Sequence, residues 1–145
     1  MTSFVTENHN LDDICELLTR FIGESVYKRD IKPEGIAKVV ASPKVYTVVV
    51  YQSAKPIGIL MAMEWEHPMF TGKAVSDMLV YVLPEHRGGT IAVRLIKMLE
   101  HWGRRIGVDG VKLGQSTQIG DMKRVMKFYE KLGYTVTGFN TMKEF

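Results

Sequence analysis

Three patterns follow one another without a gap between residues 73 and 107. The run "KAVSDMLVYVL" (73–83) becomes apolar enough at its end to be a strand buried on both faces. "PEHRGG" follows it, and from Thr90 apolar residues recur at helical spacing until Gly107. A strand that passes through a glycine loop into a long helix is typical of domains in which helices cover a largely buried sheet. The chain is therefore predicted to belong to the α/β class.

Patterns on either side predict the remaining elements. We expect strands at 3–7, 44–52, 57–67 and 111–117, helices capped by Asn10 and Asp121, a short helix from Pro33 to about Val40, and a final strand from Tyr134 onward. The predicted order is β-α-α-β-β-β-α-β-α-β, a three-layer domain with a mixed sheet. At 145 residues, the chain is expected to form a single domain over 1–145.

Composition excludes several classes of protein. The single Cys15 cannot form an intramolecular disulfide, which favours a reducing compartment. No run reaches the 18 apolar residues of a membrane span, and the N-terminus has no signal-peptide pattern. The four histidines lack metal-ligand spacing, so no metal site is expected. These observations predict a cytoplasmic protein without membrane association.

Charge is distributed unevenly along the chain. Residues 1–85 hold 8 Lys and Arg against 11 Asp and Glu, whereas residues 86–145 hold 11 against 5. The difference is typical of solvated helix faces. The alternative interpretation of this charge difference is functional: the C-terminal half would bind an anionic ligand, and the N-terminal half would face a cationic one.

The junction itself has the chemistry of an anion site. A loop that opens a helix directs free backbone N–H groups at one point, and glycines allow a ligand to approach the backbone closely. Arg87 would add a charge-assisted donor. The alternative is that Gly88 and Gly89 only make a tight turn. Neither a G-x-x-x-x-G-K-[ST] nor a G-x-G-x-x-G pattern is present, which argues against nucleoside triphosphates and dinucleotides.

Two motifs together resemble those of the GNAT superfamily of acetyl-coenzyme A-dependent N-acetyltransferases. The family signature Arg/Gln-x-x-Gly-x-Gly/Ala corresponds here to "RGGTIA" (87–92), and the later family motif "YEKLGF" corresponds to "YEKLGY" (129–134). The element order matches over nearly the whole chain, although the C-terminus is short. The compact size is similar to that of phage-encoded members.

The resemblance implies a binding mode for acetyl-coenzyme A. The main chain around Val80 and Val82 would pair with the pantetheine arm as an added strand does. The pyrophosphate would lie on Arg87, Gly88, Gly89, Thr90, Ile91 and Ala92. Two positions depart from the family pattern. Thr90 replaces a glycine, and its hydroxyl would bind a phosphate or cap the helix, while Met122 replaces an asparagine that contacts coenzyme A.

The resemblance also implies direct transfer of an acetyl group to a primary amine in a ternary complex. Tyr129 matches the tyrosine that donates a proton to the leaving thiolate, although by sequence alone it would be a core aromatic residue. The amine must lose a proton before it attacks. Asp77 is the first choice as the base, with Glu64 and Glu66 acting through water as alternatives. The competing interpretation of all three carboxylates is a solvent-facing position.

The acceptor is not specified by these patterns. Polyamines, aminoglycosides, peptide N-termini and protein lysines all offer a basic amine. By the resemblance, Tyr27 and Asp30 would shape the acceptor pocket, and Ser116 and Thr117 at a strand end are further candidates, with capping as their alternative role. Whether the protein forms a homodimer stays open.

Two other classes of function are left open. One is an inactive protein of the same fold that binds nucleic acid or a host protein through its basic C-terminal face. The nucleic-acid form of this interpretation is weakened because Trp102 and Phe128 lie on core-facing stripes. The other is an enzyme that uses a different acyl donor or modifies a nucleobase.

Overall fold

The computed structural model describes residues 1–114 and 120–145. Its elements are β1 (Thr2–Val5), α1 (Leu11–Glu24), α2 (Pro33–Ala41), β2 (Val45–Gln52), β3 (Lys55–Glu66), β4 (Lys73–Val82), a 3-10 turn η1 (Pro84–His86), α3 (Ile91–Ile106), β5 (Gly110–Lys112) and α4 (Met122–Lys131). The predicted class and the predicted order through α4 are confirmed. In the described part of the chain, no helix is both long and apolar enough to span a membrane.

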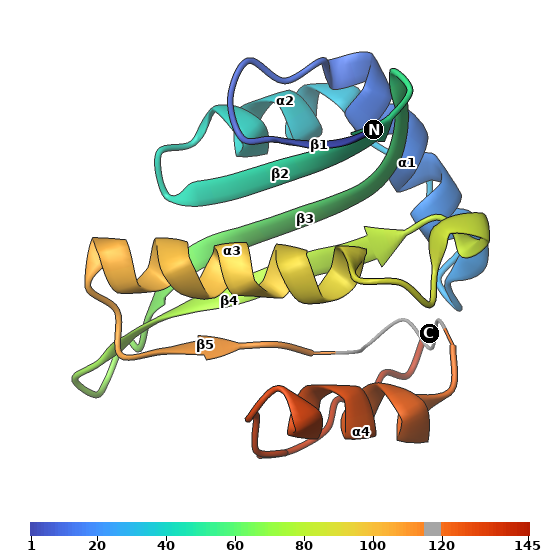
Figure 1. Cartoon of the computed structure of the whole chain (residues 1–145). Coiled ribbons are helices and arrows are strands. Elements are labelled where there is room, and N and C mark those ends of the chain that lie inside the picture. Colours follow the sequence, from blue (N-terminus) through green and yellow to red (C-terminus); the bar gives the residue numbers. More distant parts are fainter. Residues whose placement is uncertain (115–119) are drawn as a thin grey trace.

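The five strands form one mixed sheet in the order β1-β2-β3-β4-β5. Neighbouring strands are antiparallel except for β4 and β5, which are parallel. Helices α1 and α2 cover one face of the sheet and α3 covers the other, which gives the three predicted layers (Figure 1). A parallel pair needs a crossover, and α3 provides it.

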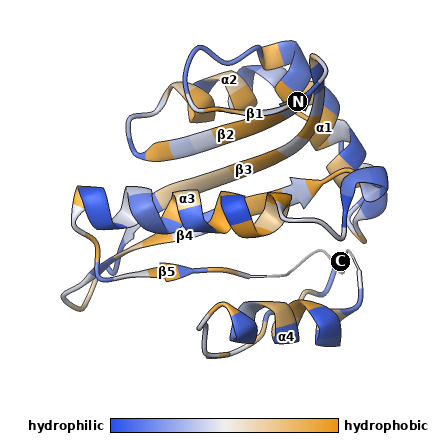
Figure 2. Ribbon diagram, viewed as in Figure 1, coloured by the Kyte–Doolittle hydropathy of each residue, from blue (hydrophilic) through white to orange (hydrophobic). Residues whose placement is uncertain are grey.

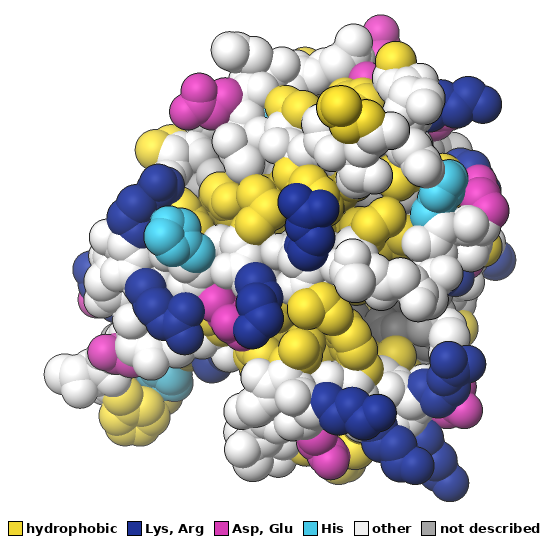
Figure 3. Space-filling model, in the orientation of Figure 1, with side chains coloured by type: hydrophobic (Ala, Val, Ile, Leu, Met, Phe, Trp, Pro, Cys, Tyr) yellow, Lys and Arg dark blue, Asp and Glu magenta, His cyan; other side chains and the backbone are white. Residues whose placement is uncertain are grey.

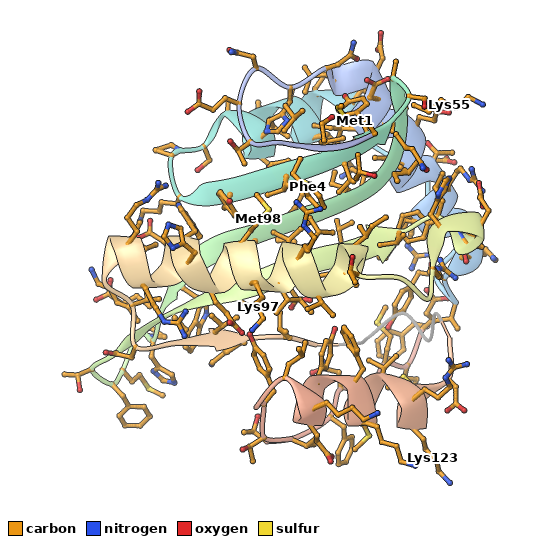
Figure 4. The ribbon with its side chains drawn as sticks, in the orientation of Figure 1. Met1, Phe4, Lys55, Lys97, Met98 and Lys123 are labelled. Atoms are coloured by element: carbon orange, nitrogen blue, oxygen red, sulfur yellow. The ribbon has the colours of Figure 1, made fainter. Side chains whose placement is uncertain are left out.

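The core lies where these layers meet. Central strands β2 and β3 are the most hydrophobic part of the ribbon, whereas α3 and α4 alternate polar and apolar residues (Figure 2). Leu95 and Leu99 of α3 are fully buried against the sheet, as are Ile14 and Leu17 of α1 on its other side. Phe4 of β1 and Met98 of α3 pack at the edge of this core, where α3 crosses the strands (Figure 4).

Local sequence signals set the helix ends as predicted. The Asn10 side chain accepts a hydrogen bond from the Asp13 N–H at 3.1 Å, and Asp121 accepts one from the Lys123 N–H at 2.9 Å. Gly107 ends α3 in the left-handed region, at φ 83°. Lys123 is directed away from the sheet at the outer end of α4 (Figure 4).

The expected final strand is wrong. Residues 134–145 follow α4 without regular secondary structure. The described part of β5, Gly110–Lys112, is only three residues long and offers little edge for a further strand to pair with. Gly138 interrupts the strand-like pattern of the tail, and Phe139 is 91% exposed. The strand-like residue pattern of the tail is therefore not enough to form a strand, because no neighbouring strand among the described residues is there to pair with it.

Candidate active site

A large open cavity of about 1690 Å³ lies between β4, α3, β5, α4 and the tail. Figure 3 shows apolar side chains gathered between α3 and α4 on this face, and Lys and Arg side chains along the outer side of α4. The apolar positions of α4 that the sequence predicts as a core stripe line this cavity instead: Val125, Phe128, Tyr129 and Leu132. Among the described residues, none of α4 is fully buried.

The cavity lies where strands β4 and β5 diverge. Their parallel pairing covers Ala74 to Ser76 of β4 and stops at Lys112 of β5. The rest of β4, including Val80 and Val82, lines the cavity. Strand edges carry N–H and C=O groups that can pair with an added extended segment. The predicted positions of Val80 and Val82 at the site are therefore consistent with the geometry.

An irregularity in β4 places Asp77 at the point of divergence. Ala62 of β3 pairs with Asp77 and Met61 pairs with Leu79, so Met78 is an extra residue that forms a bulge. Bulges redirect neighbouring side chains. The Asp77 carboxylate accepts a hydrogen bond from the Gly114 N–H at 3.1 Å, and burial raises the pKa of Asp77 to about 6 despite that hydrogen bond.

Tyr129 approaches the same residue from α4. Its hydroxyl donates to the Gly114 carbonyl oxygen at 3.4 Å, a long hydrogen bond. Burial, with a further contribution from the charge of Asp77, raises the pKa of Tyr129 to about 12. Gly114 thus links the two predicted catalytic side chains, one through its N–H and the other through its carbonyl. Sequence analysis missed Gly114, whose only signal is a glycine inside the expected strand 111–117.

The loop between β4 and α3 has the features of an anion site. Gly88 lies at φ 89°, where a turn requires glycine. Gly89 does not have a positive φ, and no heavy atom beyond its two chain neighbours lies within 4 Å of where its Cβ would be. Neither turn geometry nor packing therefore explains Gly89, and its backbone is open to a ligand. Thr90 is the N-cap residue of α3, but its side chain makes no capping hydrogen bond. Of its two expected roles, phosphate binding therefore stays a prediction.

The Arg87 side chain is engaged inside the protein. Its Nε donates to the Val82 carbonyl at 2.7 Å, and a terminal nitrogen lies 3.0 Å from a Glu24 carboxylate oxygen. Arg87, which was expected to donate hydrogen bonds to a bound anion, therefore already donates to groups of the protein. Glu24, at the end of α1, was not predicted from the sequence, because only the tertiary fold brings it to the loop.

The other predicted residues lie elsewhere. Glu64 pairs with Val75 and Glu66 with Lys73, and neither lines the cavity. Tyr27 and Asp30 lie between α1 and α2, also outside its lining. Ser116 and Thr117 fall outside the described residues. The roles proposed for these residues stay predictions.

With this geometry in place, comparison with known proteins identifies the family. A model of the acetyltransferase (GNAT) family matches residues 11–134, which include β4, the loop and α4. The chain belongs to the GNAT acetyltransferase family. No curated protein matches the sequence by direct comparison.

Solved structures share the GNAT fold at low sequence identity. A transcriptional regulator from Bacillus halodurans C-125 superposes with a TM-score of 0.78 at 14% identity, each chain being covered completely. Glucosamine-6-phosphate N-acetyltransferase from Arabidopsis thaliana gives 0.76 at 17%, covering 100% of this chain and 99% of that one. The aminoglycoside N-acetyltransferase AAC(6')-Iy in complex with coenzyme A gives 0.75 at 15%, covering 99% and 98%.

Proposed function

We propose that this protein is an N-acetyltransferase that transfers an acetyl group from acetyl-coenzyme A to a primary amine on a small molecule. The observation that carries the proposal is the divergence of β4 from β5, which opens a cavity where Asp77 and Tyr129 meet at Gly114. Family membership supports the reaction class, and a related structure holds coenzyme A. Acetyl-coenzyme A supplies the activated acetyl thioester.

Each part of the site has a task in this reaction. The free edge of β4 at Val80 and Val82 pairs with the extended pantetheine arm. The backbone N–H groups of 88–92 and the Thr90 hydroxyl bind the pyrophosphate at the start of α3. The open space at Gly89 fits this close approach. The neighbouring fold members that act on aminoglycosides and glucosamine 6-phosphate support small amines as the first acceptors to test.

Asp77 and Tyr129 serve the two proton movements. Asp77, directly or through a water, takes the proton that the amine must lose, and the amine nitrogen then forms its bond to the acetyl carbon. The carbon–sulfur bond breaks, and the Tyr129 hydroxyl donates to the departing thiolate. With its pKa at about 12, Tyr129 keeps its proton throughout the working range and is always available as the donor. Glu64 and Glu66 are the alternative bases.

A screen for thiol release tests the proposal. The purified protein is incubated with acetyl-coenzyme A and, one at a time, polyamines, aminoglycosides, amino sugar phosphates and peptides. We expect amine-dependent release of coenzyme A with at least one small amine, and an acetylated product by mass spectrometry. Salt-sensitive retention on nucleic acid without thiol release would instead support the binding-module interpretation.

A further inference from the structure

Glu24 connects three segments that are distant in sequence. It is the last residue of α1, and its carboxylate oxygens lie 3.0 and 3.1 Å from one terminal nitrogen of Arg87. The Tyr81 hydroxyl, near the end of β4, donates to the same carboxylate. The Arg87 guanidinium also lies 5.5 Å from the centre of the Tyr81 ring. One carboxylate therefore joins α1, β4 and the loop that begins at Arg87.

This contact holds the start of the loop from two sides. The Arg87 Nε donates to the carbonyl of Val82, the last residue of β4. Its main-chain N–H bonds to the Pro84 carbonyl at 3.3 Å, and the left-handed Gly88 follows directly. Arg87 is therefore held through both its side chain and its backbone, directly before residues 88–91.

A neighbouring ion pair provides an internal comparison. Arg20 and Glu85 also join α1 to this loop, but at 3.4 Å and with side chains 44% and 52% exposed. The side chains of Arg87 and Glu24 are 37% and 30% exposed, and each has one further hydrogen-bond partner, Val82 for Arg87 and Tyr81 for Glu24. Exposed ion pairs contribute little, whereas a hydrogen-bonded and partly desolvated pair contributes more. Glu85 is therefore a matched control for Glu24.

We propose that Glu24 is a positioning residue for the acyl donor. By holding Arg87 against the end of β4, it presets the backbone that binds the donor's pyrophosphate. In this arrangement Arg87 acts as a structural link and not as a direct phosphate ligand. The inference rests on the proposed function and adds a residue that touches neither substrate.

The competing arrangement makes the opposite prediction. If Arg87 bound the pyrophosphate directly, Glu24 would compete with phosphate for the guanidinium. Neutralising Glu24 would then strengthen binding of coenzyme A. If Glu24 positions the loop, neutralising it weakens binding. The sign of the change therefore separates the two arrangements.

The experiment compares two acyl donors on Glu24→Gln, Glu85→Gln and the unchanged protein. Acetyl-coenzyme A carries the pyrophosphate, and acetyl-pantetheine offers the same thioester without it. For Glu24→Gln we expect kcat/KM with acetyl-coenzyme A to fall by about tenfold, mainly through KM, since a hydrogen bond between charged groups is lost. With acetyl-pantetheine we expect no change, and Glu85→Gln should match the unchanged protein with both donors.

Calorimetry with coenzyme A measures the affinity directly. A second variant tests the same contact from its other side, in case Glu24→Gln does not fold. Arg87→Lys keeps the charge but has no Nε donor for Val82, so it should show the same donor-specific loss. Tighter binding of coenzyme A by Glu24→Gln, an equal loss with both donors, or no loss at all would each overturn the inference. Failure of the unchanged protein to bind coenzyme A or release its thiol would instead overturn the proposed function on which it depends.

Discussion

In the proposed mechanism, Asp77 is unfavourable for the fold and useful for the reaction. Its carboxylate has a single described hydrogen-bond donor besides its own main chain, the Gly114 N–H, and burial dominates its environment. The pKa of Asp77 is raised from 3.8 to about 6, so the folded state prefers the protonated acid. The native protein therefore loses stability as pH rises through this range, while the carboxylate that we propose as the base forms over the same range.

Asp77→Asn should consequently change activity and stability in opposite directions. We expect the rate at neutral pH to fall by roughly 10²–10⁴-fold, with recovery at alkaline pH where the amine is already deprotonated. The asparagine can still accept from Gly114, so the melting temperature should equal that of the unchanged protein near pH 4. At pH 7 the melting temperature of Asp77→Asn should be higher than that of the unchanged protein. The increase should be about 2–4 °C for each kcal/mol that burying the charged carboxylate costs. Parallel pH–rate profiles would exclude Asp77 and favour Glu64 or Glu66 acting through water.

Tyr129 offers a cleaner separation of packing from chemistry. Tyr129→Phe keeps the ring that lines the cavity and removes only the hydroxyl, whose described bond to Gly114 is long. We expect little change in the melting temperature and a fall in kcat of roughly 10²–10⁴-fold, or less if water replaces the donor. Stopped-flow or steady-state thiol release measures the effect. An undiminished kcat would assign Tyr129 to packing alone.

At the scale of elements, the junction of β4 with α3 combines two glycines with different roles. Gly88 serves the left-handed turn, whereas Gly89 does not have a positive φ and has open space where a Cβ would lie. The distinction matters for mutagenesis because replacing Gly88 would strain the backbone, while replacing Gly89 would fill the space that a ligand needs.

Gly89→Val should therefore weaken coenzyme A binding by at least tenfold while the protein stays folded. The physical reason is steric: the new side chain would stand where the pyrophosphate approaches the N–H groups. Isothermal calorimetry gives the affinity, and circular dichroism with thermal melting checks the fold. Unchanged affinity in a folded variant would remove the loop from the proposed site.

At the scale of the whole molecule, the core and the cavity depend on different parts of the chain. The buried cluster is built from α1, α3 and the sheet, whereas α4 and the tail contribute mainly to the cavity wall. The described tail is attached by a hydrogen bond from Tyr134 to Glu100 at 2.7 Å and by an exposed ion pair between Arg29 and Glu144.

A chain ending after Tyr134 should test this division. It keeps the bond to Glu100 and loses residues 135–145, of which the six residues 135–140 line the cavity. We expect the melting temperature to change by less than about 3 °C, corresponding to about 1 kcal/mol or less. The KM for the amine should rise, because part of the cavity wall is gone. A large loss of stability would show that the tail supports the core.

Much of this protein was predictable from its sequence because the relevant forces are local. Periodicity placed the helices and strands, and Asn10, Asp121 and Gly107 marked helix ends through side-chain and backbone bonds within a few residues. The glycine loop and the two family motifs indicated the reaction class, which the family match supports. The terminal strand was the exception, since a strand depends on a neighbour that pattern cannot supply.

Only the tertiary structure decided how the site is assembled. The bulge at Met78 and the end of β4–β5 pairing depend on register, which sequence pattern does not specify there. The meeting of Asp77 and Tyr129 at Gly114, and of Glu24 with Arg87 63 positions away, requires chain segments to be brought together by folding. Such contacts carry no local signal, because hydrogen-bond partners distant in sequence are selected by packing and not by spacing.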